Sequence, residues 1–157
     1  MAARAKAYDA VIAAPFGALG IAADRALTSI DFLPAGARPQ AASTALAREV
    51  CAQLRAYLRD GAHRFDLPLD LAGTDYQRRV WRALTRIPPG RPLSYGALAA
   101  RLASGPRAVG GACRANPVPI VVPCHRVVAC SGLGGFMGGE RAGPLSIKEW
   151  LLAHERG

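Results

Sequence analysis

The chain has 157 residues, of which 51% are hydrophobic, and it carries a formal net charge of +9. This length and composition permit one hydrophobic core or two small ones. No apolar run approaches the ~20 residues that span a bilayer. With no apolar h-region near the N-terminus and no recognisable disulfide framework among its four cysteines, we expect a cytoplasmic protein, or a nuclear one in a eukaryote.

The positive charge is concentrated in one segment. Residues 76–139 contain nine arginines and no aspartate or glutamate, whereas the remaining 11 basic and 11 acidic residues cancel. A bias in genomic base composition would explain the preference for arginine over lysine, and the segment would then be only a solvated surface. It would not explain the missing acids. A polyanionic partner would explain them.

Residues 1–72 predict a small α/β domain made of an antiparallel sheet and a helix. Short apolar runs alternate with turn signals over residues 10–34, which is typical of a β-meander. After a loop rich in proline and glycine, Ser43 is placed to cap an amphipathic helix that extends to about Asp60. Alternating apolar residues at 65–71 predict a further strand, which Pro68 would confine to a sheet edge.

Residues 73–157 predict a mostly helical, winged-helix-like domain. Thr74 and Gln77 form a capping box for a first helix that the Pro-Pro-Gly sequence at residues 88–90 would end. Ser94 caps a second short helix to about residue 102, and a third follows over residues 107–114. Two short helices joined by a tight turn that contains glycine predict a helix-turn-helix.

The apolar run at residues 120–122, bounded by prolines, predicts a buried strand that presents Cys124 and His125 at its end. A cysteine is nucleophilic as its thiolate, and a neighbouring imidazole can take the thiol proton. Adjacent Cys and His alone are more often structural than catalytic.

A glycine-rich segment at residues 129–139, which includes Phe136 and Met137, predicts a loop over a pocket. Ser146 and Glu149 form a capping box for the last helix, whose final turn carries His154 and Glu155.

Several motifs in these 157 residues occur in a fixed order between Gly73 and Glu155. They are Gly-Thr-Asp-Tyr-Gln (73–77), Val-Trp (80–81), Ile-Pro (87–88), Ser-Tyr-Gly (94–96), Arg-Ala-Val-Gly (107–110), Asn-Pro (116–117), Pro-Cys-His-Arg-Val (123–127) and Lys-Glu-Trp-Leu-Leu (148–152). Together they resemble the O6-alkylguanine-DNA alkyltransferases, and before Gly73 the resemblance is loose. The turn before residue 107 is about two residues shorter than in that family, and residues 140–144 look like an insertion.

The resemblance implies an irreversible, single-turnover transfer of an alkyl group from O6-alkylguanine to a cysteine. Whether O4-alkylthymine is a further substrate is left open by the sequence. By resemblance, Cys124 is the acceptor, His125 its water-linked base, Glu155 the acid that orients the histidine, and Asn116 a hinge. No cofactor and no metal are needed, because the damaged base supplies the alkyl group. The partner would be duplex DNA with the nucleotide flipped out, bound by a monomer that does not associate with membranes.

The same resemblance assigns residues to the substrate. Tyr95 would help rotate the nucleotide and bond the base, while Val127 and the loop with Phe136 and Met137 would form the pocket walls. Arg107 would fill the gap left by the extruded base, and Arg114 on the same helix is a further candidate for DNA contact.

Three other functions remain open from the residues. A non-catalytic protein that binds alkylated DNA lesions would lack the acceptor cysteine, which is present here. A cysteine hydrolase could use Cys124, His125 and Glu155, although adjacent Cys and His rarely have hydrolase geometry. A zinc site could use Cys113, Cys124, His125 and Cys130, although their spacing is not that of paired metal-binding knuckles.

Overall fold

A computed structural model describes residues 6–130 and 144–157, with residues 144–146 described by their backbone alone. Within these residues, no helix is long and apolar enough to cross a membrane. The expected loop with Phe136 and Met137 lies outside the described residues.

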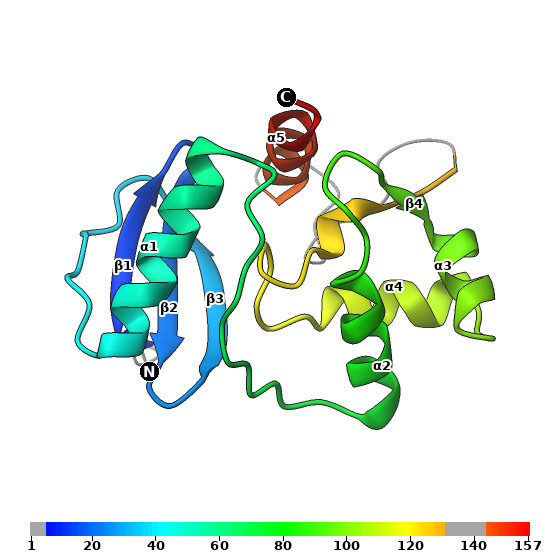
Figure 1. The fold of residues 1–157 in the computed structure, drawn as a ribbon, viewed down its shortest axis with the longest axis horizontal. Helices are drawn as coiled ribbons and strands as arrows, with labels where there is room; N and C mark the ends of the chain where they lie inside the picture. The colour runs from blue at the N-terminus through cyan, green and yellow to red at the C-terminus, as the bar shows by residue number, and fades with distance from the viewer. Residues whose placement is uncertain (1–5, 131–143) are drawn as a thin grey trace, which may run out of the picture.

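The N-terminal part is a three-stranded antiparallel meander covered by one helix, as predicted (Figure 1). Strands β1 (Ala10–Ala14), β2 (Gly17–Ala23) and β3 (Leu27–Leu33) pair in sequence order. Helix α1 (Ala45–Arg59) packs an apolar face on the sheet, with these residues buried: Ala47, Val50, Cys51, Leu54 and Tyr57.

The cap of α1 differs from the expectation by one residue. Thr44, not Ser43, accepts a hydrogen bond from the backbone N–H of Ala47. The Ser43 hydroxyl instead donates to Asp9 at the start of the sheet. Ser43 therefore attaches the loop to β1, and Thr44 supplies the helix cap.

The predicted edge strand at residues 65–71 is wrong. Only Leu69 forms a bridge, parallel to Leu27, and the segment is otherwise an extended linker. Its alternation arises because Phe65, Leu67 and Leu71 pack against the core without pairing in a ladder. Any extended segment that lies on an apolar surface buries alternate side chains, so this alternation alone does not show that the segment pairs in a sheet.

The C-terminal part is mostly helical. It contains α2 (Asp75–Leu84), β4 (Leu93–Ser94), α3 (Tyr95–Arg101), α4 (Pro106–Arg114), a short 3-10 turn η1 (Cys124–Arg126), β5 (Val127–Val128) and α5 (Pro144–Arg156). The capping box of Thr74 and Gln77 is confirmed, and so is the Ser94 cap of α3. Strands β4 and β5 pair in parallel.

Two predicted helix ends were wrong. Helix α2 stops at Leu84, with Thr85 as its C-cap, before the Pro-Pro-Gly sequence is reached. Helix α5 begins at Pro144, so Ser146 lies inside it and is not its N-cap. Proline is favoured in the first helical turn because its missing N–H would have had no intrahelical partner.

Helix α2 fixes the position of α4 and of the turn before it. The indole N–H of Trp81 donates to the carbonyl of Ala112 at 2.9 Å in the core. The Arg79 guanidinium donates to the carbonyl of Leu102, and the hydroxyls of Tyr76 and Ser104 hydrogen bond at 2.7 Å. The short turn between α3 and α4 is thereby held in place by hydrogen bonds from α2.

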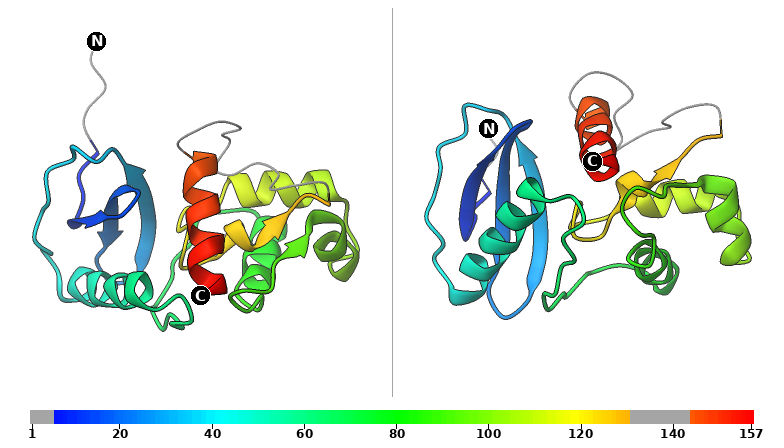
Figure 2. Two further views of the ribbon diagram at one scale, coloured as in Figure 1. Left: turned by 90° about the horizontal axis from the view of Figure 1, so that it is seen from above. Right: turned by 45° about the horizontal axis from the view of Figure 1, so that its top comes forward.

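Helix α5 lies between the sheet and helices α2–α4 (Figures 1 and 2). Its aromatic residue Trp150 packs edge-on against Phe16 of the hairpin between β1 and β2. His154 stacks on Trp150, and its Nε2 lies 2.6 Å from the backbone carbonyl of Tyr57. The last turn of the chain is consequently fixed against the N-terminal part.

Two glycines allow this close approach of α5. A Cβ on Gly61 would lie 2.8 Å from the carbonyl oxygen of His154, and one on Gly90, whose φ is +79°, would lie 3.2 Å from that of Glu155. Both neighbours are backbone atoms, which cannot move without displacing the helix end.

We expect Gly61→Ala to lower the free energy of unfolding by about 1–3 kcal/mol, as overpacking against fixed atoms does. The measurement is denaturant unfolding, with Gly36→Ala as the control because a Cβ at Gly36 meets nothing within 4 Å. Equal unfolding midpoints for the two variants would contradict the close packing of α5.

Candidate active site

The segment before Cys124 is a buried turn and not the predicted strand. Ile120 and Val122 are each 1% exposed, but the backbone N–H of Val122 donates to the carbonyl of Val118 at 3.0 Å, and Ile120 has a φ of +74°. The prolines at 117, 119 and 123 have no N–H to donate, so this run cannot form a continuous ladder. Burial was predicted correctly from the apolar residues, whereas their conformation was not.

Asn116 holds this turn from inside. It is 2% exposed, and its side-chain amide donates to the carbonyl of Val122 at 2.7 Å while its oxygen accepts from the N–H of Val118 at 3.0 Å. The N–H of Ile30 on β3 donates to the carbonyl of Pro117 at 2.9 Å. The turn that leads to Cys124 is therefore braced by its own asparagine and by the edge of the sheet.

Cys124 opens the 3-10 turn η1 and is 3% exposed. Burial raises the pKa of its thiol to about 11, against the opposing effects of a hydrogen bond with Asn116 and the charge of Lys148. At neutral pH the resting group is a thiol. Its use as a nucleophile therefore requires a base at the moment of reaction.

The next residue, His125, is fully buried, and its Nε2 lies 2.7 Å from a carboxylate oxygen of Glu155. Burial lowers the pKa of the imidazole, and this effect exceeds the opposing influence of Glu155. A carboxylate only accepts hydrogen bonds, so we assign the proton of the neutral ring to Nε2. Nδ1, which has no hydrogen-bond partner among the described residues, then carries a free lone pair.

Glu155 is the centre of a larger buried network. Its oxygens accept hydrogen bonds from Nε and Nη2 of Arg126, each at 2.9 Å, and from the hydroxyl of Tyr57 at 2.7 Å. Burial alone would raise the pKa of Glu155, but hydrogen bonds and charge from His125 and Arg126 lower it to about 2. The carboxylate stays ionised, and Arg126 balances its charge without requiring a charged histidine.

Two members of this network were missed from the sequence. Arg126 was treated as one of the excess arginines, yet it is only 7% exposed and also donates to the carbonyl of Ile87. Tyr57 was assigned to the buried face of α1. A signal was available for Tyr57, because a buried phenol requires a hydrogen-bond partner, but nothing in the sequence named Glu155 as that partner.

Lys148 is a third residue whose role was not predicted. It is fully buried, its Nζ donates to the carbonyl of Val127 at 2.8 Å, and it lies 5.7 Å from the centre of the Tyr95 ring. Burial lowers its pKa to about 8, against the attraction of Cys124 and Cys113. The signal was its position between Ile147 and Leu151, where a lysine interrupts the apolar face of α5.

Tyr95, the first residue of α3, is half-buried beside Lys148. Burial, followed by the nearby Cys113 and Cys124, raises the pKa of its phenol to about 12, so the hydroxyl is protonated at neutral pH. Val127, predicted to form a pocket wall, is fully buried in β5. The structure thus brings Cys124, Tyr95 and Lys148 into mutual electrostatic contact.

The predicted DNA contacts lie on α4, and the charge of Arg114 acts on Tyr95 of the cluster. Arg107 and Arg114 are exposed near the two ends of α4. Cys113, on the buried side of the same helix, is 6% exposed. In the parts of the chain that the structure describes, no three His, Cys, Asp or Glu side chains are grouped as metal ligands.

Comparison with known proteins gives the same family as the sequence motifs. The model of the 6-O-methylguanine DNA methyltransferase, DNA binding domain, matches residues 75–157. A methylated-DNA–protein-cysteine methyltransferase from Mycolicibacterium paratuberculosis is 50% identical over 107 residues, which cover 66% of this chain and 62% of that protein. One from Methanosarcina barkeri is 37% identical over 94% of this chain and 96% of its own length.

The match spans between half and two thirds of several of these relatives, for example 54% of the Mycobacterium bovis protein. Among solved structures, a variant of the Mycobacterium tuberculosis O6-methylguanine methyltransferase superimposes with a TM-score of 0.79 at 36% identity, covering 94% of this chain and 91% of that one. A structure of the M. tuberculosis protein in complex with DNA gives a TM-score of 0.76 at 37% identity, covering 93% and 91%.

The family match covers more than half of the chain, and it includes the buried Cys-His-Arg segment and the helix that carries Glu155. The chain therefore belongs to the 6-O-methylguanine DNA methyltransferase family.

Proposed function

We propose that this protein repairs DNA by direct reversal, by moving the alkyl group of O6-alkylguanine onto Cys124. The observation that carries the proposal is a buried thiol followed by a neutral histidine whose Nε2 is bound to an ionised glutamate. Relatives at 37–50% identity are named as methylated-DNA–protein-cysteine methyltransferases, which supports the same reaction here.

In the proposed step, His125 Nδ1 takes the proton of the Cys124 thiol, directly or through a water molecule. The sulfur then attacks the alkyl carbon, a carbon–sulfur bond forms, and the bond between that carbon and O6 of guanine breaks. Glu155 keeps Nε2 protonated and stabilises the imidazolium that forms. The thioether product is stable to hydrolysis by neighbouring acids or bases, so each molecule acts once in this proposal.

The departing guanine needs a proton or a positive charge as its oxygen is released. Tyr95 and Lys148 supply these in our proposal, because the phenol is protonated and the ammonium has a pKa of about 8 beside it. A charge held in a low-dielectric site stabilises developing negative charge more strongly than it would in water. Val127, with the segment containing Phe136 and Met137, would enclose the base.

The DNA-binding part in this proposal is a winged helix-turn-helix formed by α3, α4 and the β4–β5 pair. It belongs to a domain of residues 73–157 that follows a domain of residues 1–72. Arg107 and Arg114 on α4, and Arg101 at the end of α3, are exposed cations on this element. Flipping a nucleotide costs a few kcal/mol, and Arg107 would offset part of this by filling the vacated stack.

The proposed partner is duplex DNA that carries the lesion. The protein would bind it as a monomer, in the cytoplasm of a bacterium or the nucleus of a eukaryote. The DNA complex of the M. tuberculosis protein supports DNA as a partner. Should Cys124 take up no alkyl group, the alternative of a non-catalytic lesion-binding protein would replace this proposal.

Cys124→Ala should abolish alkyl transfer and leave binding to an O6-methylguanine duplex largely intact, because the proposed DNA contacts are on α3 and α4. Mass spectrometry after incubation with that duplex should show one added methyl group on the unmodified protein, located at Cys124. Cys130→Ser, at an exposed position, is the control and should retain full transfer. Label on Cys51, Cys113 or Cys130, or more than one equivalent, would contradict the assignment.

Arg107→Ala should slow repair in duplex DNA far more than reaction with free O6-methylguanine. An arginine that only contacts phosphate would weaken all DNA binding and reduce the salt slope by about one unit. Rates on both substrates decide between these roles, with Arg101→Ala and Arg114→Ala as matched variants. An equal loss on free base and duplex would indicate pocket damage, and an unchanged duplex rate would assign the role to Arg101 or Arg114.

Glu155→Gln should slow transfer by up to roughly 10²–10⁴-fold, the usual contribution of a positioned general base, because His125 loses the carboxylate that keeps Nε2 protonated and stabilises its imidazolium. It should also destabilise the fold at pH 7 by about 3–5 kcal/mol, because Arg126 is left without its buried counter-charge. The carboxylate has a folded pKa of about 2 against an ordinary value of 4.5. Its contribution to stability is therefore complete above pH 4.5 and is lost as the pH falls towards 2.

The difference in unfolding free energy between the unmodified protein and Glu155→Gln should accordingly narrow between pH 4.5 and 2. Glu149→Gln, an exposed substitution on the same helix, should show neither effect. A difference that does not change with pH would mean that Glu155 is not held ionised in the fold.

A further inference from the structure

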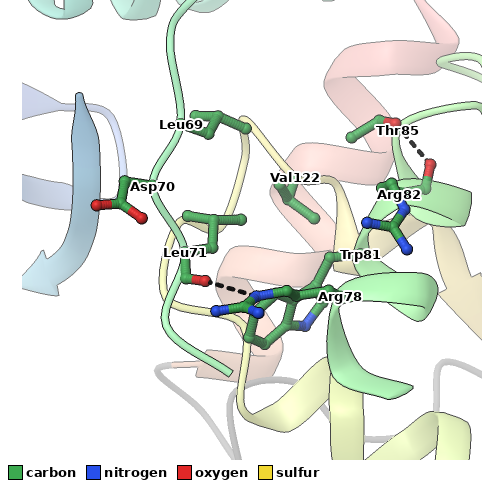
Figure 3. A pocket seen from close by; sticks show the side chains of 8 residues that line it. All are labelled: Leu69, Asp70, Leu71, Arg78, Trp81, Arg82, Thr85 and Val122. Carbon is green, nitrogen blue, oxygen red and sulfur yellow. Dashed lines mark hydrogen bonds between the residues drawn. The ribbon is translucent and has the colours of Figure 1, made fainter. Parts of the chain in front are cut away.

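A groove runs along the linker between the N-terminal and C-terminal parts, away from the α3–α4 element. It consists of two adjoining cavities of about 410 Å³ and 510 Å³, which share Leu69 and Thr85 as lining residues. The linker forms one wall and the exposed side of α2 forms the other (Figure 3). In Figure 1 the linker and α3 lie on opposite sides of α2.

Apolar side chains form part of the inner surface of both cavities, and the second cavity is also lined by the polar side chains of Thr85 and Arg126. Val122 lies behind the first cavity, between Leu71 of the linker and Trp81 of α2 (Figure 3). The second cavity is lined by Phe65 and by the segment that leads to Cys124, namely Ile120, Val121 and Pro123. At its rim, Leu69 is 37% exposed and is the one large hydrophobic residue exposed in the described part of the chain.

The rim of the groove is basic. Arg78 and Arg82 line the first cavity, and Arg64 and Arg86 line the second, all four being exposed. None of the four forms an ion pair with a described residue. The one acid in the lining, Asp70, lies on the side of the linker away from α2 (Figure 3).

A hydrogen-bonding group in the second cavity also lacks a partner. His63 lines this cavity, and its Nε2 is buried with no hydrogen-bond partner among the described residues. Carboxylate groups would complement the arginines of the rim, since arginine binds carboxylates through paired N–H groups. Apolar cavities beneath a basic rim favour a peptide, whose apolar side chains can enter the cavities. The phosphate backbone of a nucleic acid has no such side chains.

We propose that this groove binds an acidic segment of a partner protein that carries apolar anchor residues. The apolar side chains would occupy the cavities beside Leu69, and the carboxylates would bind the arginine rim. Buried apolar anchors surrounded by charge pairs are the usual arrangement of peptide grooves. The groove therefore gives the protein a second docking surface, separate from the one proposed for DNA.

The test is fluorescence anisotropy with a fluorescein-labelled peptide of sequence Gly-Asp-Asp-Asp-Leu-Phe and the full chain. We expect saturable binding that is lost when the aspartates are replaced by lysines and weakened when Leu-Phe is replaced by Ser-Ser. The double variant Arg82→Glu/Arg86→Glu and the single variant Leu69→Asp should each weaken binding about tenfold or more, corresponding to at least about 1.4 kcal/mol.

The matched control is Arg48→Glu/Arg55→Glu, the same charge change at exposed positions on α1, which should bind the peptide like the unmodified chain. Cys124→Ala should also bind normally, so this result does not depend on the proposed transfer reaction. The proposal is overturned if the peptide fails to bind, or if the α1 and α2 variants lose affinity equally. It is also overturned if duplex DNA displaces the peptide and the α2 variants lose DNA affinity to the same degree, which would make the groove a nucleic-acid surface.

Discussion

The fold and the candidate site both depend on one buried carboxylate. Glu155 accepts hydrogen bonds from α1 through Tyr57 and from η1 through His125 and Arg126. A buried charge is tolerated only when its partners are in place, so these contacts also require α5 to end where the structure has it. The backbone around Glu155 meets that requirement, because Gly61 and Gly90 leave no side chain in the way. Forming the network therefore aligns the N-terminal part, the cysteine turn and the last helix together.

The charge balance of this network determines the protonation of the acceptor. Arg126 neutralises Glu155, so the imidazole of His125 stays neutral and retains a lone pair on Nδ1. A charged histidine in its place could not accept a proton. Cys124 is likewise neutral, since its burial outweighs the help of Asn116 and Lys148. The resting site thus holds an acid and a base that are both uncharged, and charge develops only when the proton leaves the sulfur.

The sequence predicted the meander, helix α1, the capping box at Thr74 and the short helices α3 and α4, because caps, prolines and periodicity act locally. Prediction from the sequence failed where contacts between distant parts of the chain determine the local conformation. Residues 120–122 look like a strand by composition, but a ladder needs N–H groups that the flanking prolines lack and a neighbour that no local pattern specifies. Glu155 was assigned by resemblance, and its contact with His125 is present. Its contacts with Tyr57, 98 positions away, and with Arg126 were not foreseeable from spacing. The sequence shows Lys148 as a charged residue on an apolar helix face. Its hydrogen-bond partner is a backbone carbonyl, which residue types cannot identify.

The protonated state of the Cys124 thiol also bears on how long the protein stays usable. A thiolate exposed to solvent reacts with peroxides and soluble electrophiles, whereas a buried thiol with a raised pKa reacts slowly with both. In the proposed reaction Cys124 is not regenerated, so each such side reaction would remove one protein molecule from those available for transfer. The burial that makes Cys124 dependent on His125 therefore also preserves its capacity until a substrate is seated. The raised pKa of the Cys124 thiol would thus both limit its reaction with soluble electrophiles and require a base for the proposed transfer.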